Sequence, residues 1–449
     1  MEATEWVENQ DMPFCFSSRY IIVISLELLP AKRLWGIIKK NATKNVTKYD
    51  KENQKGMVSN MKIVYVCLCG LYMDGWGYQD NLLAKYHVRL GHEVTVITSN
   101  WVYSHEGEYI RTDKTEETDR NGVKIRRIPI KGNHNFTYKI KRYTGLYEKL
   151  EEEKPDLIFV HSSQFLDAKQ IAEYAKKHPG IKIYVDNHCD YSNSATNWLS
   201  KNILHRILWR RSAKLLEPYT EKFYGVLPAR VDFMRELYGI REDKLALLVM
   251  GADDEKVEEA AHEEVKENIR QKLSVKKEDF LIVTGGKIDH AKKQTLLLMD
   301  AVQQMNRDNV KLVVFGSIVD DLRDEVLKRC TQDGRIQYIG WLNSDDTYPY
   351  FAAADLVVFP GRHSVMWEQV VAQGIPMICK YWDGTTHVDL GGNVHFLYED
   401  STEEIVRELT AVMDDPELYG KMQDVARTKG MQEFSYREIA KRAIGENRI

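Results

Sequence analysis

Short apolar runs recur along the chain from Met61 onward, and segments with helical periodicity separate them. The runs that predict strands form a first series at 61–68, 94–98, 157–161 and 181–185, and a second at 280–285, 311–316, 336–340, 356–360 and 376–380. Strands that alternate with helices in this way favour parallel sheets built from right-handed crossover units. The pattern resets near residue 251. We therefore expect an α/β protein with two doubly wound, Rossmann-like domains, 61–250 and 251–449, that face each other across a cleft.

The first 60 residues do not continue this pattern. One short apolar run, 20–29, is followed by a polar stretch rich in Lys and Asn at 39–60. Such a composition predicts a flexible segment, and we interpret 1–60 as an extension of a fold that begins at Met61. The apolar run is too short to span a membrane, and it contains Glu27.

The composition restricts the classes of function. The chain has 449 residues, of which 43% are hydrophobic and 29% charged, and its formal net charge is −4. Binding to nucleic acid requires a marked basic excess, so we expect no nucleic-acid partner. The six cysteines lack the paired spacing of a zinc site or a disulfide framework. No apolar run is long enough for a membrane span, and together these features indicate a cytoplasmic protein.

A glycine-rich loop follows the first predicted strand. Gly70, Gly75 and Gly77 lie between that strand and a predicted helix, where glycines let backbone N–H groups approach an anion. Their spacing is not that of the dinucleotide-binding fingerprint. A phosphate-binding loop and a merely tight turn therefore remain as two interpretations.

Two lysines stand near the end of the strand predicted at 280–285. Lys287 comes directly after Gly285 and Gly286, and Lys292 stands further on, at a helix start. Two cations and free N–H groups at one strand end would bind a diphosphate. The alternative is a pair of solvated surface charges.

An acid lies in the first turns of the helix after the strand at 356–360. Glu368 follows a short polar loop and precedes Gly374 and Pro376, where the next strand begins. A carboxylate here can accept hydrogen bonds from two hydroxyl groups, such as those of a ribose. It could equally be an acid that stabilises the helix dipole.

Two histidines end strands of the first domain. His188 follows the strand at 181–185, and His161 ends the strand at 157–161. Side chains at the carboxyl ends of parallel strands face the ligand cleft, and the pKa of imidazole suits it to proton transfer or charge stabilisation. Of the two, His188 is the stronger candidate for a functional role and His161 the weaker. The alternative for each is a purely structural role.

Taken in order, these motifs resemble those of the family 4 glycosyltransferases, which are retaining enzymes of the GT-B fold. The segment 75–78, followed by 90–98, is similar to the N-terminal signature of that family. The segment 286–292 resembles its diphosphate motif, and 368–376 resembles the end of its two-glutamate motif. The resemblance extends over 61–449.

The resemblance implies transfer of a sugar, with retention of anomeric configuration, from a UDP- or GDP-sugar to a glycan or lipid-linked acceptor. The implied setting is bacterial surface polysaccharide biosynthesis. The resemblance assigns a catalytic role to His188 and His363, and donor-binding roles to Gly75, Gly77, Lys287, Lys292, Ser364, Val365 and Glu368. Lys287 stands where the family usually has arginine.

One position departs from the family pattern. Eight residues before Glu368, where a first glutamate is expected, the chain has Pro360. We interpret the chain as a member of a variant subgroup in which His363 and the backbone amides of Ser364 and Val365 meet the donor. Because no Asp-x-Asp triplet occurs in the chain, we expect catalysis without a metal ion or other cofactor, with lysines stabilising the leaving diphosphate.

Two other functions fit the same motifs. A nucleotide-sugar epimerase would share the fold and would convert a donor without any acceptor. The missing first glutamate also allows a catalytically degenerate subunit that binds a donor or serves as a scaffold.

A basic amphipathic stretch at 201–214 suggests a further partner. Apolar residues are interspersed there with Lys and Arg, and no acid follows until Glu217. Such a segment can lie in an anionic lipid surface, so we hypothesise peripheral contact with the inner face of the cell membrane. The alternative is a helix packed on the first domain with its charges in solvent.

Overall fold

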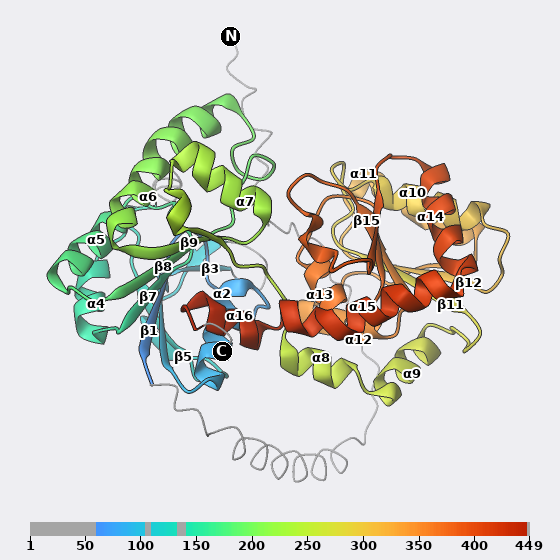
Figure 1. The fold of residues 1–449 in the computed structure, drawn as a ribbon, viewed down its shortest axis with the longest axis horizontal. Coiled ribbons are helices and arrows are strands. Elements are labelled where there is room, and N and C mark those ends of the chain that lie inside the picture. Colours follow the sequence, from blue (N-terminus) through green and yellow to red (C-terminus); the bar gives the residue numbers. More distant parts are fainter. Residues whose placement is uncertain (1–59, 104–108, 133–140, 447–449) are drawn as a thin grey trace, which may run out of the picture.

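The computed structural model describes residues 60–103, 109–132 and 141–446. They form two α/β domains, each built on its own sheet, that lie side by side (Figure 1). The prediction of two doubly wound domains is therefore confirmed. Residues 1–59, nearly all of the predicted extension, lie outside the described residues.

The first domain is built on an eight-stranded sheet with the order β10-β9-β8-β7-β1-β2-β6-β5. Its neighbouring strands are parallel, except for the antiparallel pair β5–β6. The strands are β1 (Lys62–Cys67), β2 (Glu93–Ser99), β5 (Glu116–Thr118), β6 (Lys124–Ile128), β7 (Leu157–Val160), β8 (Lys182–Asn187), β9 (Thr220–Gly225) and β10 (Leu245–Leu247). The surrounding helices include α2 (Gln79–Arg89), α4 (Leu146–Glu153), α5 (Ala168–Lys177), η1 (Ser200–Trp209), α6 (Arg210–Leu216), α7 (Pro228–Phe233) and η3 (Met234–Tyr238). A separate hairpin joins β3 (Trp101–Tyr103) and β4 (Tyr109–Arg111).

Burial on both faces explains the central place of β1. Val64 and Val66 pack into the core on one face of the sheet, and Ile63 and Tyr65 pack into the core on the other. All four side chains are at most 2% exposed. A strand covered on both faces is a continuous apolar run in the sequence, which is the pattern at 61–68.

The second domain is built on a six-stranded, all-parallel sheet with the order β13-β12-β11-β14-β15-β16. The strands are β11 (Phe280–Gly285), β12 (Val310–Phe315), β13 (Ile336–Tyr338), β14 (Leu356–Phe359), β15 (Met377–Lys380) and β16 (Val394–Leu397). The helices are α8 (Asp254–Ala260), α9 (Glu263–Lys272), α10 (Gln294–Gln304), α11 (Asp320–Gln332), α12 (Ser344–Ala352), α13 (Met366–Ala372), η5 (Thr386–Val388), α14 (Thr402–Asp414), α15 (Pro416–Phe434) and α16 (Tyr436–Ala443).

The chain crosses between the two domains twice. Where it first crosses, before α8, Lys85 Nζ of α2 lies 2.7 Å from a carboxylate oxygen of Asp253, and Tyr86 Oη donates to the same carboxylate at 2.6 Å. After α15 the chain crosses back, and α16 packs against α2 of the first domain. There His87 Nε2 lies 2.8 Å from the carbonyl oxygen of Ala440. Thus α16 covers part of the first domain, although it follows every strand of the second sheet.

Candidate functional site

The predicted site residues gather at the carboxyl ends of strands from both sheets. In the first domain Gly75 and Gly77 follow β1 and His188 follows β8; in the second domain Lys287 and Lys292 follow β11, and His363, Ser364, Val365 and Glu368 follow β14. Doubly wound sheets bind their ligands at this edge. In each domain these residues therefore lie at the same edge of the sheet, although they are far apart in the sequence.

The two predicted lysines of the donor site line one small cavity. Its walls are formed by Thr284, Gly285, Lys287, Lys292, Thr295, Phe359, Pro360, Gly361, Arg362 and Ser364. Burial lowers the pKa of Lys292, Asp289 opposes that effect, and the nearby charges of Arg362 and Lys287 lower the pKa further. Cations that repel one another in this way are stabilised when an anion binds between them. The cavity therefore has the chemistry of an anion site.

Sequence reasoning missed Arg362. It lies in the loop between β14 and α13, where it adds a third cation to the cavity. The available signal was a basic residue directly after Gly361, at the end of a buried strand.

Two glycines let the backbone beside this cavity pack closely. Gly316 has a φ of 128°, in the left-handed region, and a Cβ atom there would overlap the carbonyl oxygen of Gly286. A larger residue at position 316 would push apart the loops that follow β11 and β12. The close packing of these two loops therefore depends on glycine at this position.

The carboxylate of Glu368 contacts two imidazoles in the second domain. Its Oε1 atom lies 3.0 Å from His363 Nε2 and 2.8 Å from His387 Nε2. Burial raises the pKa of this carboxyl, but His363 and His387 outweigh burial and hold it well below its usual range. Among the described residues, Glu368 Oε2 is buried without a hydrogen-bond partner. Oε2 is thus the carboxylate oxygen that can accept a further hydrogen bond.

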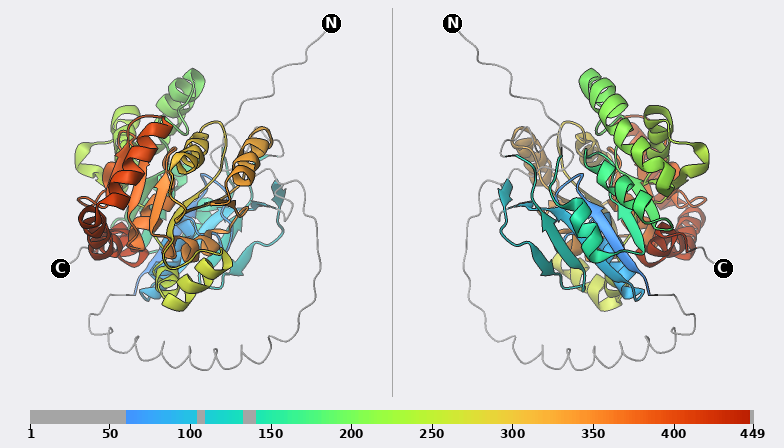
Figure 2. Two further views of the ribbon diagram at one scale, coloured as in Figure 1. Left: turned by 90° about the vertical axis from the view of Figure 1, so that its right-hand side faces the viewer. Right: turned by 90° about the vertical axis from the view of Figure 1, so that its left-hand side faces the viewer.

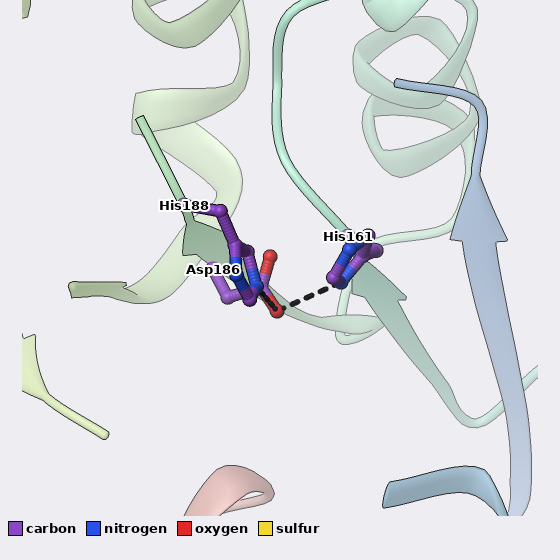
Figure 3. Close-up of side chains that lie close together, drawn as sticks. All are labelled: His161, Asp186 and His188. Atoms are coloured by element: carbon purple, nitrogen blue, oxygen red, sulfur yellow. Dashed lines mark hydrogen bonds and ion pairs between the residues drawn. The ribbon is translucent and has the colours of Figure 1, made fainter. Parts of the chain in front are cut away.

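A second group of the same kind lies in the first domain. Figure 3 shows His161, Asp186 and His188 directed toward one another at the ends of β7 and β8. Asp186 Oδ2 lies 3.0 Å from His161 Nδ1 and 3.2 Å from His188 Nε2, and Asp186 Oδ1 accepts a hydrogen bond from the backbone N–H of Ser162 at 2.8 Å. The buried carboxylate thus joins the predicted catalytic His188 to His161, the second candidate from the sequence.

Asp186 favours different protonation states for these two histidines. Burial opposes the charged form of His161, but the Asp186 carboxylate outweighs burial and raises the pKa of His161 to about 10. Burial lowers the pKa of His188, and the attraction of Asp186 does not compensate for it. At neutral pH, His161 therefore carries the proton and His188 is a neutral imidazole.

The two imidazole–carboxylate groups also have the donor types of a metal site. In each group the ligand atoms of His161, Asp186 and His188, or of His363, Glu368 and His387, lie within 4.8 Å of one another. In both groups the two imidazoles contact the same carboxylate oxygen, and in the second group His387 Nδ1 and Glu368 Oε2 are buried without a hydrogen-bond partner among the described residues. Metal-free catalysis remains a prediction.

The glycine loop of the first domain reaches the second domain. Gly75 has a φ of 76°, as a tight turn requires. A Cβ atom on Gly77 would lie 2.8 Å from Ser344 Oγ, at the start of α12. The small size of Gly77 therefore allows the loop after β1 to approach the second domain closely, whatever its role toward a phosphate.

Two family models match this chain. "Glycosyltransferase Family 4" matches residues 81–256, and "Glycosyl transferases group 1" matches residues 279–415. An uncharacterized glycosyltransferase of Methanocaldococcus jannaschii is 22% identical over 382 residues, which cover 82% of this chain and 92% of that relative.

Solved structures share the arrangement of two facing domains. Anabaena HepE in complex with UDP has a TM-score of 0.60 at 15% identity, with 85% of this chain and 98% of that chain covered. The UDP-GlcNAc 2-epimerase of Neisseria meningitidis bound to UDP-GlcNAc has a TM-score of 0.55 at 14% identity, with 86% and 100% covered. At these identities the likeness shows the fold alone.

Proposed function

Since the chain belongs to glycosyltransferase family 4, we propose that this GT-B enzyme transfers a sugar from a nucleoside diphosphate donor to a hydroxyl group of a glycan or lipid-linked acceptor. The anomeric carbon exchanges its bond to the diphosphate for a bond to the acceptor oxygen. The diphosphate leaves with the electron pair of the broken bond, and the acceptor releases its hydroxyl proton. Configuration at the anomeric carbon is retained, and the setting is bacterial surface polysaccharide biosynthesis.

The cation-lined cavity is the observation that supports this proposal most strongly. Lys287, Lys292 and Arg362 surround one small space at the carboxyl ends of β11 and β14. A leaving diphosphate gains negative charge as the sugar departs, and fixed cations stabilise that charge in the transition state. A UDP- or GDP-sugar supplies such a leaving group without the need for a metal ion.

The other predicted residues complete the proposed site. Glu368 binds the ribose through Oε2, and His363, Ser364 and Val365 meet the donor sugar. His188 lies on the acceptor side as a neutral imidazole. In this variant subgroup, the loop 360–365 takes the place of the missing first glutamate.

A thermal-shift screen of the full chain against UDP, GDP, ADP and CMP tests the donor site. A ligand that binds only the native state must raise the melting temperature. We expect one diphosphate to raise it in the wild type and to have little effect in Lys287→Ala. The absence of any shift in the wild type would contradict the donor site and would favour the scaffold alternative.

An epimerase remains the second candidate, because the Neisseria enzyme shares the fold. Incubation with donor alone separates the two activities. A transferase leaves the donor sugar unchanged in the absence of an acceptor, whereas an epimerase converts it to its epimer.

We also propose that 201–214 attaches the enzyme to the inner face of the cell membrane. This stretch forms η1 and α6 at the edge of the first domain (Figure 2). One face packs inward through buried His205, Trp209 and Ala213. The other face and the residues before it are open to solvent: Ile207 is 55% exposed, Leu199 60% and Trp198 71%.

The charges of this stretch also support contact with a membrane. Exposed cations stand beside these apolar side chains at Arg206, Arg210, Arg211 and Lys214. Apolar groups flanked by cations are suited to an anionic lipid surface. Among the described helices, none is long and apolar enough to span a bilayer, so the proposed contact is peripheral.

A further inference from the structure

Arg230 is a largely buried cation that uses only one nitrogen of its guanidinium in hydrogen bonds to the described part of the protein. It lies near the start of α7, where Nε donates to Asp190 Oδ2 at 3.1 Å. Its side chain is only 13% exposed. The two terminal nitrogens of the guanidinium make no hydrogen bond to any of the described residues. Neither terminal nitrogen is among the fully buried polar atoms, so both can donate hydrogen bonds to a ligand.

The partner of Arg230 is itself held firmly. Asp190 Oδ1 accepts hydrogen bonds from the backbone N–H groups of Ser192 and Asn193, at 2.7 and 3.0 Å. The carbonyl oxygen of Arg230 also accepts a hydrogen bond from Asn187 Nδ2 at 3.4 Å. The position of the guanidinium is therefore set before any ligand binds.

The helix that carries Arg230 touches the second domain. The backbone N–H of Ala229 donates to the carbonyl oxygen of Gly384 at 3.2 Å. A Cβ atom on Gly384 would lie 2.6 Å from Ala229 Cβ, so the two backbones approach very closely. Figure 1 shows α7 on the side of the first domain that faces the second. Arg230 therefore stands at a contact between the domains.

The charge of Arg230 acts on histidines of both domains. Burial lowers the pKa of His188, and Arg230 contributes to the same effect. Burial lowers the pKa of His363 as well, and Arg230 again contributes. His363 lies in the loop that also supplies Gly361, Arg362 and Ser364 to the donor cavity. Arg230 is therefore near enough to His188 of the first domain and His363 of the second for its charge to act on both.

We propose that Arg230 is a catalytic residue that binds the sugar-linked phosphate of the donor from the first domain. This inference rests on the proposed function. As the bond between the anomeric carbon and the phosphate oxygen breaks, the electron pair passes to that oxygen, and Arg230 donates hydrogen bonds to the phosphate. The acceptor oxygen bonds to the anomeric carbon, and its proton passes to the leaving diphosphate. Lys287, Lys292 and Arg362 hold the same diphosphate from the second domain.

Calorimetric titration of the full chain with UDP, GDP, ADP and CDP, and with the matching monophosphates, tests this role. In Arg230→Gln we expect the affinity for the best diphosphate to fall about tenfold, as loss of one charge-assisted hydrogen bond implies. Affinity for the monophosphate should change less than about twofold, because it lacks the phosphate that Arg230 contacts. Arg230→Lys should recover part of the loss, since it keeps the charge.

Arg235→Gln is the matched control, because Arg235 follows on η3 and pairs at the surface with Asp232 and Glu242. It should bind diphosphates as the wild type does. Equal diphosphate affinity in the wild type and in folded Arg230→Gln would overturn the proposed role of Arg230 but would leave the proposed donor site intact. Equal losses for diphosphate and monophosphate would also overturn it, since they would indicate a merely structural role. A wild type that binds no diphosphate would overturn the donor site and the role of Arg230 together.

Discussion

At the scale of single residues, one buried carboxylate oxygen holds two imidazoles in each domain. Asp186 joins His161 to His188, and Glu368 joins His363 to His387. The sequence predicted His188 and Glu368 from their places after predicted strands, and His363 from the resemblance to the family. It could not predict His387, which is 19 residues from Glu368 and is brought to it only by the packing of η5.

Removal of one cation from the donor cavity should lower the rate of transfer. In Lys287→Ala we expect kcat to fall about 100-fold, because one fixed charge no longer stabilises the leaving diphosphate. The Lys287 side chain is 54% exposed, so the melting temperature should not change. Steady-state kinetics and thermal unfolding measure the two quantities. Lys328→Ala, an exposed lysine on α11, is the control, and near-normal turnover of Lys287→Ala would contradict the assignment.

The ion pair of His161 with Asp186 should make stability depend on pH. Since the pKa of His161 is raised from 6.5 to about 10, its stabilisation is complete below about pH 6.5 and is lost as the pH rises through 10. The difference in free energy of unfolding between the wild type and His161→Gln should be about 3 kcal/mol near pH 6 and should shrink toward pH 10. Urea unfolding from pH 6 to 10 measures it. A difference that stays constant with pH would exclude a charged pair.

At the scale of elements, the sequence predicted the central strands β8, β7, β1 and β2 of the first sheet but not its outer strands, and it predicted the second sheet out to its edge strand β13. β1, β7 and β11 are almost fully buried, so the chain shows them as continuous apolar runs. β6 has the sequence Lys-Ile-Arg-Arg-Ile, and its arginines form ion pairs: Arg126 with Glu153 at 2.9 Å, and Arg127 with Glu117 at 3.0 Å. A strand with so many charged side chains does not show as an apolar run in the sequence, because the partners of these charges are known only from the folded sheet.

The exposed face of η1 and the residues before it should determine membrane attachment. The wild type should co-sediment with vesicles of phosphatidylglycerol and not with vesicles of phosphatidylcholine, because anionic lipid attracts the neighbouring cations. Trp198→Ser with Ile207→Ser should weaken binding at least about tenfold, since burial of each such side chain is worth about 1.5–3 kcal/mol. Leu327→Ser on α11, where the leucine is 41% exposed, is the control. Equal sedimentation of the wild type with both lipids, or with neither, would contradict the proposal.

At the scale of the whole molecule, two crossings of the chain join the domains. The reset of the strand pattern near residue 251 indicated the first crossing. The second crossing could not be predicted, because periodicity identifies an apolar face of α16 but not the helix that covers it. The contact between α16 and α2 depends on residues that are more than 300 positions apart, such as His87 and Ala440.

The first crossing should contribute strongly to stability through Asp253. This residue is 6% exposed, and its carboxylate accepts hydrogen bonds from Lys85 Nζ at 2.8 and 2.7 Å and from Glu255 N at 3.2 Å. Asp253→Ala leaves Glu255 as the remaining carboxylate partner of Lys85, deprives the Tyr86 hydroxyl of its acceptor and removes the N-cap of α8, so we expect a loss of at least about 2 kcal/mol in the free energy of unfolding. Urea denaturation measures the loss. Asp424→Ala, at an exposed position on α15, should be neutral, and a similar value for both variants would contradict the role of Asp253.

The return of α16 to α2 also has a consequence for biosynthesis. A ribosome delivers the first domain early, but the helix that covers α2 emerges only after all six strands of the second sheet. Until then that face of α2 lacks its partner and is open to unwanted association. The first domain therefore cannot complete its packing until the second domain has been synthesised. A chaperone that binds α2 during translation would protect it until α16 emerges.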